Sequence, residues 1–267
     1  MSTLATRVGA TTIGRRDLLQ LGAAVAATSA LGPTARAESK TTATPPAKAI
    51  GFDGFVIFDP RPIAALAETL FPGKGAALVA IWRTRQFEYC WLRTMMGRYA
   101  DFLSVTEASL VYAAAMHKVA LTAERRDRLM QAYLEMKAHP DVLPGLQALR
   151  AAGIRLGFIS NLTQPMLEAA TKNAGLDGYF EQFLSTDRVR AYKPDPRAYA
   201  MGQDGFGLKR EEIVFAAFGG WDAAGAKSFG YRTFWCNRLG QPVEGLEADP
   251  DGIGATVGDL ARFVLGA

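Results

Sequence analysis

Four short segments place polar side chains at the ends of predicted strands or in the loops beside them. They are Asp53, Ser160-Asn161, Lys193 and Asp222. A carboxylate can attack a carbon or phosphorus centre and form a covalent ester, and a lysine beside it keeps that carboxylate ionised. A Ser–Asn pair can orient a substrate, and a second carboxylate can activate the water that hydrolyses the ester. Together the segments predict a hydrolase that works through an aspartyl ester.

Each segment on its own also has a purely structural explanation. Ser160 is a candidate helix cap, Lys193 a residue of a solvated turn, and Asp222 a candidate N-cap. Asp53 is harder to explain in this way, because it interrupts the apolar run 49–58. A lone carboxylate in a buried strand is costly, and unpaired Asp is rarely buried. A nucleophile at the carboxyl end of the first strand, where α/β sheets place their sites, explains it better.

The elements that must position these residues read as an α/β fold. The run 49–58 is a predicted strand, and a long helical region follows it, broken at Pro72–Gly75 and restarted with Thr122 as the cap. Strands and helices then alternate. The predicted strands are 154–159, 213–218 and 231–236, and the predicted helices are 143–152, 164–174, 196–203 and 223–229.

This alternation predicts a Rossmann-like parallel sheet with helices on both faces. The all-helical block that separates the first strand from the others predicts an inserted cap over the carboxyl edge of the sheet. We therefore assign 49–62 and 137–267 to the core domain and 63–136 to the helical cap.

The N-terminal segment has the order of features of a secretory signal. Arg15-Arg16 precedes an apolar region from Leu18 to Leu31, and Ala35-Arg36-Ala37 provides a small-x-small cleavage site. The arginine pair favours the twin-arginine export machinery as a partner and a periplasmic or otherwise exported protein after cleavage near Ala37. A short membrane anchor and an ordinary first helix are the alternatives. Residues 38–48 read as a flexible, Pro-containing linker.

Charge and composition exclude several classes of partner. Residues 1–37 carry four arginines and one aspartate, which accounts for +3 of the net charge of +4. The mature chain is therefore close to neutral, and neither a nucleic acid nor a membrane surface is a predicted partner. No later segment is apolar enough for a stable membrane anchor. Cys90 and Cys236 are predicted to be separate buried thiols, and His117 and His139 form no motif for a triad or a metal site.

From about residue 48 onward, the chain resembles the haloacid dehalogenase superfamily, and within it the type II 2-haloacid dehalogenases. The order Asp53, Ser160, Lys193, Asp222 fits the superfamily. The more specific match is the stretch 81–93, IWRTRQFEYCWLR. Further matches are Ser160-Asn161, Tyr192-Lys193-Pro194-Asp195, Tyr199, Trp221-Asp222 and Asn237-Arg238.

The resemblance implies a metal-independent dehalogenase without a cofactor that acts on short 2-haloalkanoic acids. Asp53 would displace the halide with inversion, and water activated near Asp222 would hydrolyse the ester. By the same resemblance, the substrate and halide contacts would come from Arg83, Ser160, Asn161, Tyr199 and Trp221, with Lys193 beside the nucleophile. A solvated helix arginine is the alternative for Arg83. Homodimerisation, common in the resembling family, is left open.

Phosphatases of the superfamily carry a second Asp where this chain has Phe55, and the acidic loop here supplies one carboxylate instead of two for Mg²⁺, so these residues favour a metal-free hydrolase over a phosphatase. Two departures from the type II dehalogenase pattern limit what the resemblance implies. The loop after Asp53 is one residue shorter than usual and lacks its Gly-Thr pair. Ala217 and Gly219 stand where Ser and Asn are usual. A Mg-dependent phosphatase and a catalytically weak protein that binds small carboxylates are therefore the competing hypotheses.

Overall fold

The computed structural model of the chain describes residues 46–266, so the predicted signal segment 1–37 and most of the linker lie outside the described residues. In chain order the elements are β1 (Ala49–Phe52), α1 (Gly54–Ile57), β2 (Phe58–Asp59), α2 (Arg61–Leu70), α3 (Gly75–Met95), α4 (Phe102–Met116), α5 (Ala123–Leu134), β3 (Lys137–Ala138), α6 (Val142–Ala151), β4 (Arg155–Ser160), α7 (Gln164–Asn173), β5 (Gln182–Ser185), α8 (Pro196–Phe206), β6 (Ile213–Ala217), α9 (Gly220–Phe229), β7 (Arg232–Cys236), β8 (Gly252–Gly254) and α10 (Val257–Leu265).

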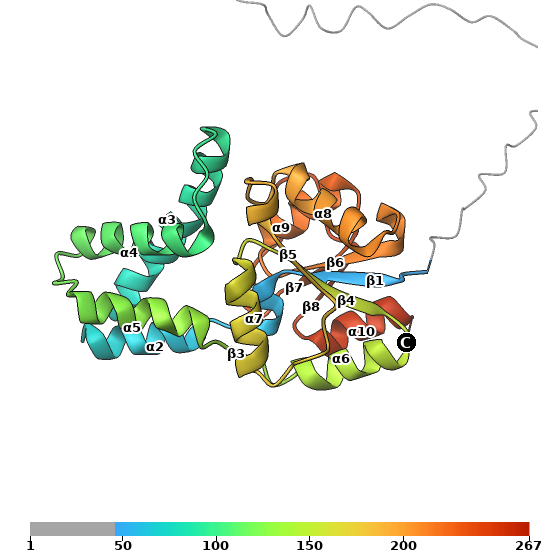
Figure 1. The fold of residues 1–267 in the computed structure, drawn as a ribbon, viewed down its shortest axis with the longest axis horizontal. Helices are drawn as coiled ribbons and strands as arrows, with labels where there is room; N and C mark the ends of the chain where they lie inside the picture. Colours follow the sequence, from blue (N-terminus) through green and yellow to red (C-terminus); the bar gives the residue numbers. More distant parts are fainter. Residues whose placement is uncertain (1–45, 267) are drawn as a thin grey trace, which may run out of the picture. The chain divides into compact units, whose positions relative to one another are not determined.

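The core is a six-stranded parallel sheet with the order β5-β4-β1-β6-β7-β8. Figure 1 shows α8 and α9 on one side of this sheet and α6 and α10 on the other. Side chains alternate between the two faces along each strand. Ile50 and Phe52 of β1 therefore pack in the apolar cluster that contains Leu146 of α6. Ala49 packs in the cluster that contains Tyr199 of α8. The predicted α/β fold with helices on both faces is confirmed.

The first predicted strand is shorter than the apolar run suggested. It ends at Phe52, and residues 54–57 form the single-turn helix α1 instead of continuing the strand. Asp53 begins this helix, because its backbone is extended and its carboxylate accepts a hydrogen bond from the N–H of Phe55. Gly54 permits the turn, since a Cβ at this position would lie 2.6 Å from Leu162 Cδ1. Apolar periodicity could not reveal this turn, because every residue of α1 is buried.

Helices α2–α5 form the cap, and the antiparallel pair β2–β3 carries both chain crossings between cap and core. The predicted break at 72–75 and the Thr122 cap of α5 are both present, the latter as a hydrogen bond from Arg125 N to Thr122 Oγ1. Trp82 ties α3 to α4 by donating from Nε1 to the carbonyl of Thr106, 2.8 Å away. The helical segment lies close to the predicted limits 63–136, although the exact domain limits stay a prediction.

The core contains elements with no counterpart among the predicted ones, namely β3, α10 and the strands β5 and β8. The strands β5 and β8 extend the sheet at its two edges. The edge strand β8 has only three residues, two of them glycine, so it lacks an apolar pattern.

The prediction of two separate buried thiols is confirmed, because Cys90 and Cys236 are both buried and free. Within residues 46–266, no helix is both long and apolar enough to cross a membrane.

Candidate active site

Asp53 lies where β1 ends and α1 begins, at the carboxyl edge of the sheet. Its backbone N–H donates to the carbonyl of Ala216 on the adjacent strand β6, at 2.9 Å. Its Oδ1 accepts from the N–H of Phe55 at 2.9 Å, and its Oδ2 accepts from Lys193 Nζ at 2.7 Å. Both carboxylate oxygens therefore have fixed partners, which is the preorganisation that a nucleophile needs.

A buried lysine joins the two predicted catalytic carboxylates. Lys193 Nζ lies 2.7 Å from Asp53 Oδ2 and 2.7 Å from Asp222 Oδ2, and its side chain is wholly buried. Asp222 lies in the first turn of α9, where Tyr199 Oη of α8 donates to its Oδ1 at 2.8 Å. The structure thus brings together Asp53, Lys193, Asp222 and Tyr199, which the sequence had placed in four separate segments.

Burial and charge shift the pKa values of this cluster in a consistent way. Burial raises the pKa of Asp222 to about 6, and the negative charge of Asp53 acts in the same direction, whereas Lys193 and Tyr199 oppose the rise. Burial alone lowers the pKa of Lys193, but the charges of Asp222 and Asp53 more than compensate and raise it above its usual value. Lys193 therefore stays charged and compensates the negative charge of the carboxylates on either side of it.

Two residues at the end of β4 and in the loop after it hold the backbone around this cluster. Asn161 Oδ1 accepts from the backbone N–H of Lys193 at 3.1 Å, which fixes the segment that carries the lysine. Ser160 Oγ accepts from the N–H of Leu162 at 3.1 Å and so shapes the turn after β4. Both residues are buried. Ser160 therefore shapes a turn and does not cap a helix, since Thr163 is the N-cap of α7, and it lies directly beside Gly54.

Asp53 opens on a cavity of about 290 Å³ between core and cap. Five of the predicted site residues line this reaction cavity: Asp53, Arg83, Asn161, Trp221 and Asp222. Ser160, Lys193 and Tyr199 do not line it. Instead, Lys193 and Tyr199 contact the carboxylates of Asp53 and Asp222, as described above. These five residues present two carboxylates, one guanidinium, one amide and one indole to a substrate, and Thr84, Gln241 and Glu244 add further polar groups to the lining.

The cap supplies one wall of the reaction cavity through helix α3. The Arg83 guanidinium lies 5.7 Å from the centre of the Phe55 ring. Trp221 of α9 packs against two aromatic residues of α3, with ring centres 5.4 Å from Phe87 and 5.3 Å from Trp91. Cap and core thus meet through an aromatic cluster, and a cationic side chain lies over the nucleophile loop.

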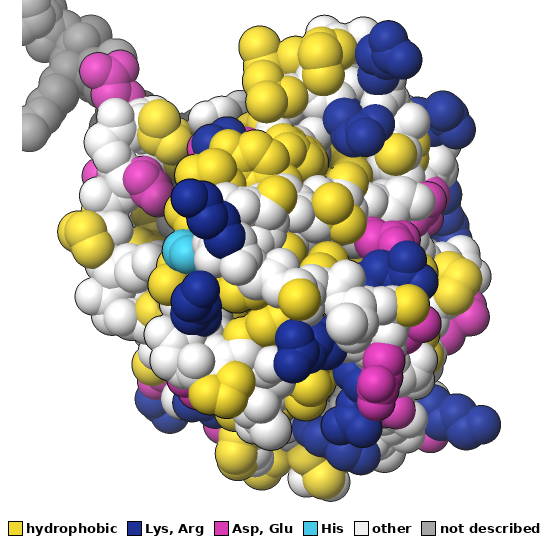
Figure 2. All heavy atoms as spheres, turned by 90° about the vertical axis from the view of Figure 1, so that its left-hand side faces the viewer, with side chains coloured by type: hydrophobic (Ala, Val, Ile, Leu, Met, Phe, Trp, Pro, Cys, Tyr) yellow, Lys and Arg dark blue, Asp and Glu magenta, His cyan; other side chains and the backbone are white. Residues whose placement is uncertain are grey.

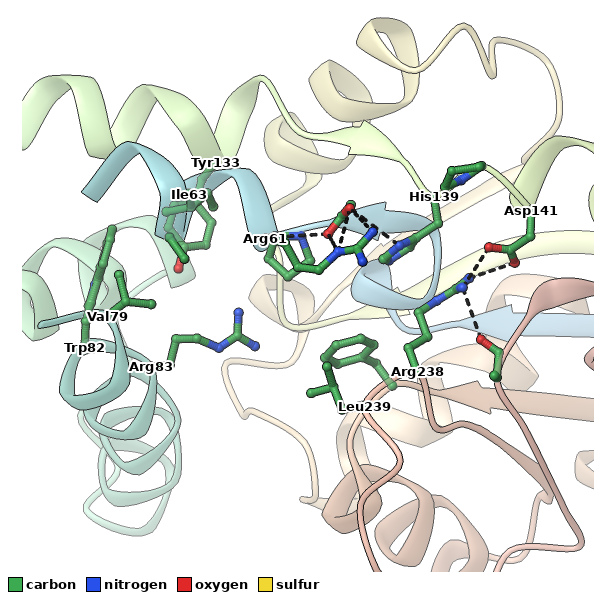
Figure 3. Close-up of a pocket in the computed structure, with 16 residues that line it drawn as sticks. Arg61, Ile63, Val79, Trp82, Arg83, Tyr133, His139, Asp141, Arg238 and Leu239 are labelled. Carbon is green, nitrogen blue, oxygen red and sulfur yellow. Dashed lines mark hydrogen bonds and ion pairs between the residues drawn. The ribbon is translucent and has the colours of Figure 1, made fainter. Parts of the chain in front are cut away.

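Two residues that the sequence did not mark as functional hold the shortened nucleophile loop. The carbonyl of Phe55 lies 3.3 Å from His139 Nε2, and the carbonyl of Val56 accepts from Arg238 Nη2 at 2.9 Å. Arg238 is itself fixed by Asp141, at 2.8 and 3.0 Å, and Figure 3 shows this pair beside His139. Because a four-residue helix leaves its carbonyls unpaired, the short loop was one signal for such partners, and the family match at Asn237-Arg238 was another.

The residues at this site do not fit a magnesium ion, which the competing phosphatase hypothesis requires. All four carboxylate oxygens of Asp53 and Asp222 already have a partner in the protein: both Oδ2 atoms accept from Lys193 Nζ, and the Oδ1 atoms accept from the Phe55 N–H and from Tyr199 Oη. The Phe55 side chain adds no oxygen ligand, and its carbonyl lies 3.3 Å from His139 Nε2. Throughout residues 46–266, no group of three or more His, Cys, Asp or Glu side chains is arranged to hold a metal ion.

Most of the chain is similar in sequence to known hydrolases. Residues 26–230 match the family described as haloacid dehalogenase-like hydrolase. The haloacetate dehalogenase H-2 of Moraxella sp. (strain B) is 38% identical over 205 residues, 76% of this chain and 92% of the relative. The (S)-2-haloacid dehalogenase of Pseudomonas sp. (strain YL) is 37% identical over 205 residues, 76% of this chain and 88% of the relative.

Solved structures show the same similarity in three dimensions. The L-2-haloacid dehalogenase RSc1362 is 42% identical with a TM-score of 0.81, covering 83% of this chain and 100% of that one. The L-2-haloacid dehalogenase from Xanthobacter autotrophicus, solved with chloropropionic acid covalently bound, is 32% identical with a TM-score of 0.77, covering 82% and 99%. The likeness therefore extends over the core and the cap together.

Replacement of Lys193 by Met tests the electrostatic description of the site. Without the ammonium, Asp53 and Asp222 face each other in a buried setting, and we expect a loss of about 3–5 kcal/mol in the free energy of unfolding near pH 8. The loss should shrink near pH 5, because the uncompensated pair then binds a proton in the folded state and stability rises as the pH falls. Urea unfolding at both pH values measures this.

The matched control is the double variant Lys193→Met/Asp222→Asn, which removes one of the two repelling charges. It should recover part of the stability that the single variant loses near pH 8. An equal loss in the single variant at both pH values would contradict the description.

Proposed function

The chain belongs to the haloacid dehalogenase superfamily and, within it, to the L-2-haloacid dehalogenases. From this premise we propose that it hydrolyses short 2-haloalkanoic acids to 2-hydroxy acids through an ester on Asp53. The observation that carries the proposal is the fixed carboxylate of Asp53 at a cavity lined by Arg83, Asn161 and Trp221.

In the first step, a carboxylate oxygen of Asp53 attacks C2 of the substrate from the side opposite the halogen. The new C–O bond forms as the carbon–halogen bond breaks, and the halide leaves with the bonding electron pair, so C2 is inverted. Developing halide charge needs cationic and N–H partners, which the guanidinium of Arg83 and the amide of Asn161 supply. Trp221 adds an apolar wall.

In the second step, water adds to the carbonyl carbon of the Asp53 ester and gives one proton to Asp222. Lys193 Nζ, 2.7 Å from Asp53 Oδ2, stabilises the negative charge that develops on the ester. The tetrahedral intermediate collapses, and the 2-hydroxy acid leaves with the remaining proton of that water. Asp222 then releases its proton to the solvent, and Asp53 is a free carboxylate again that carries one oxygen from the water.

The competing hypotheses have less support. The phosphatase alternative lacks a second acid at Phe55, and the oxygens of Asp53 and Asp222 already have partners in the protein. The weak-binding alternative, a protein that retains a small carboxylate without turnover, predicts binding but no halide release, and the next experiment distinguishes it directly.

Turnover in heavy-oxygen water tests the ester on Asp53. We expect chloride release from (S)-2-chloropropionate and, after a single turnover, one heavy oxygen in the peptide that contains Asp53, measured by mass spectrometry. Asp53→Asn should abolish chloride release, because the amide is a poor nucleophile. Label found only in the lactate product would show direct attack by water, and binding without any chloride would favour the weak-binding alternative.

The pH dependence tests the role of Asp222. Since its pKa is raised to about 6, Asp222 is protonated at lower pH and cannot accept the proton of the attacking water. We expect steady-state turnover to fall about tenfold from pH 7 to pH 5. Rapid-quench measurement near pH 5 should then show a burst of halide equal to the enzyme concentration, followed by slow release. Turnover that is constant between these pH values would contradict the assignment.

We also propose that the protein is exported by the twin-arginine route and works in the periplasm. The support is the sequence of residues 1–37 alone, which lie outside the described part of the chain. Replacement of Arg15 and Arg16 by Lys should retain the full-length protein in the cytoplasm, as measured by cell fractionation and immunoblotting. Recovery of the unaltered protein in the cytoplasm, uncleaved, would contradict export.

We also propose that the protein forms a homodimer through the cap. Figure 2 shows the cap side of the molecule, where apolar side chains lie among Lys and Arg. The exposed apolar side chains here are Leu92 and Met95 on α3, Met96 directly after it, and Val111 and Met116 on α4. Such a cluster favours contact with a second copy, and light scattering of the purified protein determines whether its mass is that of one chain or two.

A further inference from the structure

A second cavity, of about 420 Å³, lies between cap and core next to the reaction cavity. Arg83, Phe218 and Leu239 line both cavities, so the two adjoin at these residues. Figure 3 shows the second cavity with cap side chains on one side and core side chains on the other, and with Arg83 pointing into the space between them. Its volume exceeds that of the reaction cavity, and none of the steps proposed above uses it.

The cap wall of this second cavity is apolar. Its apolar members are Ile63, Ala64, Val79, Trp82 and Tyr133, and Arg83 of the cap lies where the two cavities adjoin. Trp82 Nε1 donates to the carbonyl of Thr106, and Trp82 and Tyr133 pack edge to face with ring centres 5.5 Å apart. The indole N–H is thus already occupied within the cap, so this wall offers mainly hydrocarbon surface to a ligand.

The core wall is charged, but its charges are paired. Arg61 lies 2.6 Å from Asp59, and Arg238 lies 2.8 Å from Asp141 and also donates to the nucleophile loop. Burial and the neighbouring Arg238 lower the pKa of His139, which keeps its ring neutral at neutral pH. Among the lining residues, all of them in the described range, Arg83 is the one cation without a carboxylate within 4 Å.

We propose that this second cavity, the chain chamber, receives the carbon chain at C2 of 2-haloalkanoic acids longer than chloropropionate. The proposal rests on the dehalogenase function given above, with carboxylate and halogen in the reaction cavity and Arg83 at the junction. Because Arg83 is engaged by the halide at the junction, a second acidic group would find no other unpaired cation in the chamber, whereas an alkyl chain would cover Val79 and Trp82. Each buried methylene is then expected to raise kcat/KM by up to about fourfold.

The experiment compares two substrates in three proteins. Bromide release is measured from 2-bromopropionate and 2-bromohexanoate, for the unaltered chain and for Ala64→Phe, which fills the chamber from α2. The matched control is Ala65→Phe, the same substitution on the exposed neighbouring residue, which does not line the chamber. Val79→Phe, from α3, replaces Ala64→Phe if thermal melting shows that the latter does not fold.

We expect the unaltered protein to use 2-bromohexanoate at least as well as 2-bromopropionate. Ala64→Phe should lower kcat/KM for the longer acid by about tenfold or more and change that for the shorter one by less than about twofold. Ala65→Phe should alter neither.

Three results would overturn the proposal. One is a fall of about tenfold or more from the shorter to the longer acid in the unaltered protein. Another is an equal loss on both acids in Ala64→Phe, which would identify the chamber as a route of passage. The absence of bromide release from both acids would overturn the dehalogenase function as well.

Discussion

The site depends on one buried ammonium between two carboxylates. Removing Lys193, Asp53 and Asp222 from water is costly, and only close pairing with further hydrogen bonds compensates for it. The distances of 2.7 Å from Lys193 Nζ to each carboxylate, and the Tyr199 bond to Asp222, meet this requirement. Asp53 directly follows β1, Lys193 lies in the loop before α8, and Asp222 lies in the first turn of α9. The cluster therefore requires the sheet to bring these three segments to one edge. The pairing of these charges and the proposed chemistry therefore both require the same arrangement of the three segments.

The sequence was sufficient to predict this convergence and the fold around it. Alternating strands and helices imply a parallel sheet, and the carboxyl ends of its strands meet at one edge. Asp53, Lys193 and Asp222 could thus be assigned to one site without knowledge of any distance. The edge strand β8 could not be predicted, because Gly252-Ile253-Gly254 carries no apolar pattern and gains its structure by pairing with β7.

The nucleophile loop shows a second limit of local sequence patterns. A fully buried turn and a fully buried strand have the same apolar sequence, so the run from Phe55 to Phe58 could not distinguish them. The partners of this loop are also remote. His139 is 84 positions from Phe55, and Arg238 is 182 positions from Val56. Only the tertiary fold shows how a loop without the usual Gly-Thr pair is held, namely by side chains that bind its free carbonyls.

The side chains that hold the nucleophile loop also limit what can bind in the chain chamber. Arg238 and His139 hold the loop that carries Asp53, and Asp141 fixes Arg238 through two hydrogen bonds. These groups also form part of the core wall of the adjoining cavity, where their hydrogen-bonding capacity is directed to the loop instead of to a ligand. A polar ligand would therefore have to compete with contacts that position the nucleophile. An alkyl chain would not, because it gains from the apolar cap wall and leaves those hydrogen bonds intact.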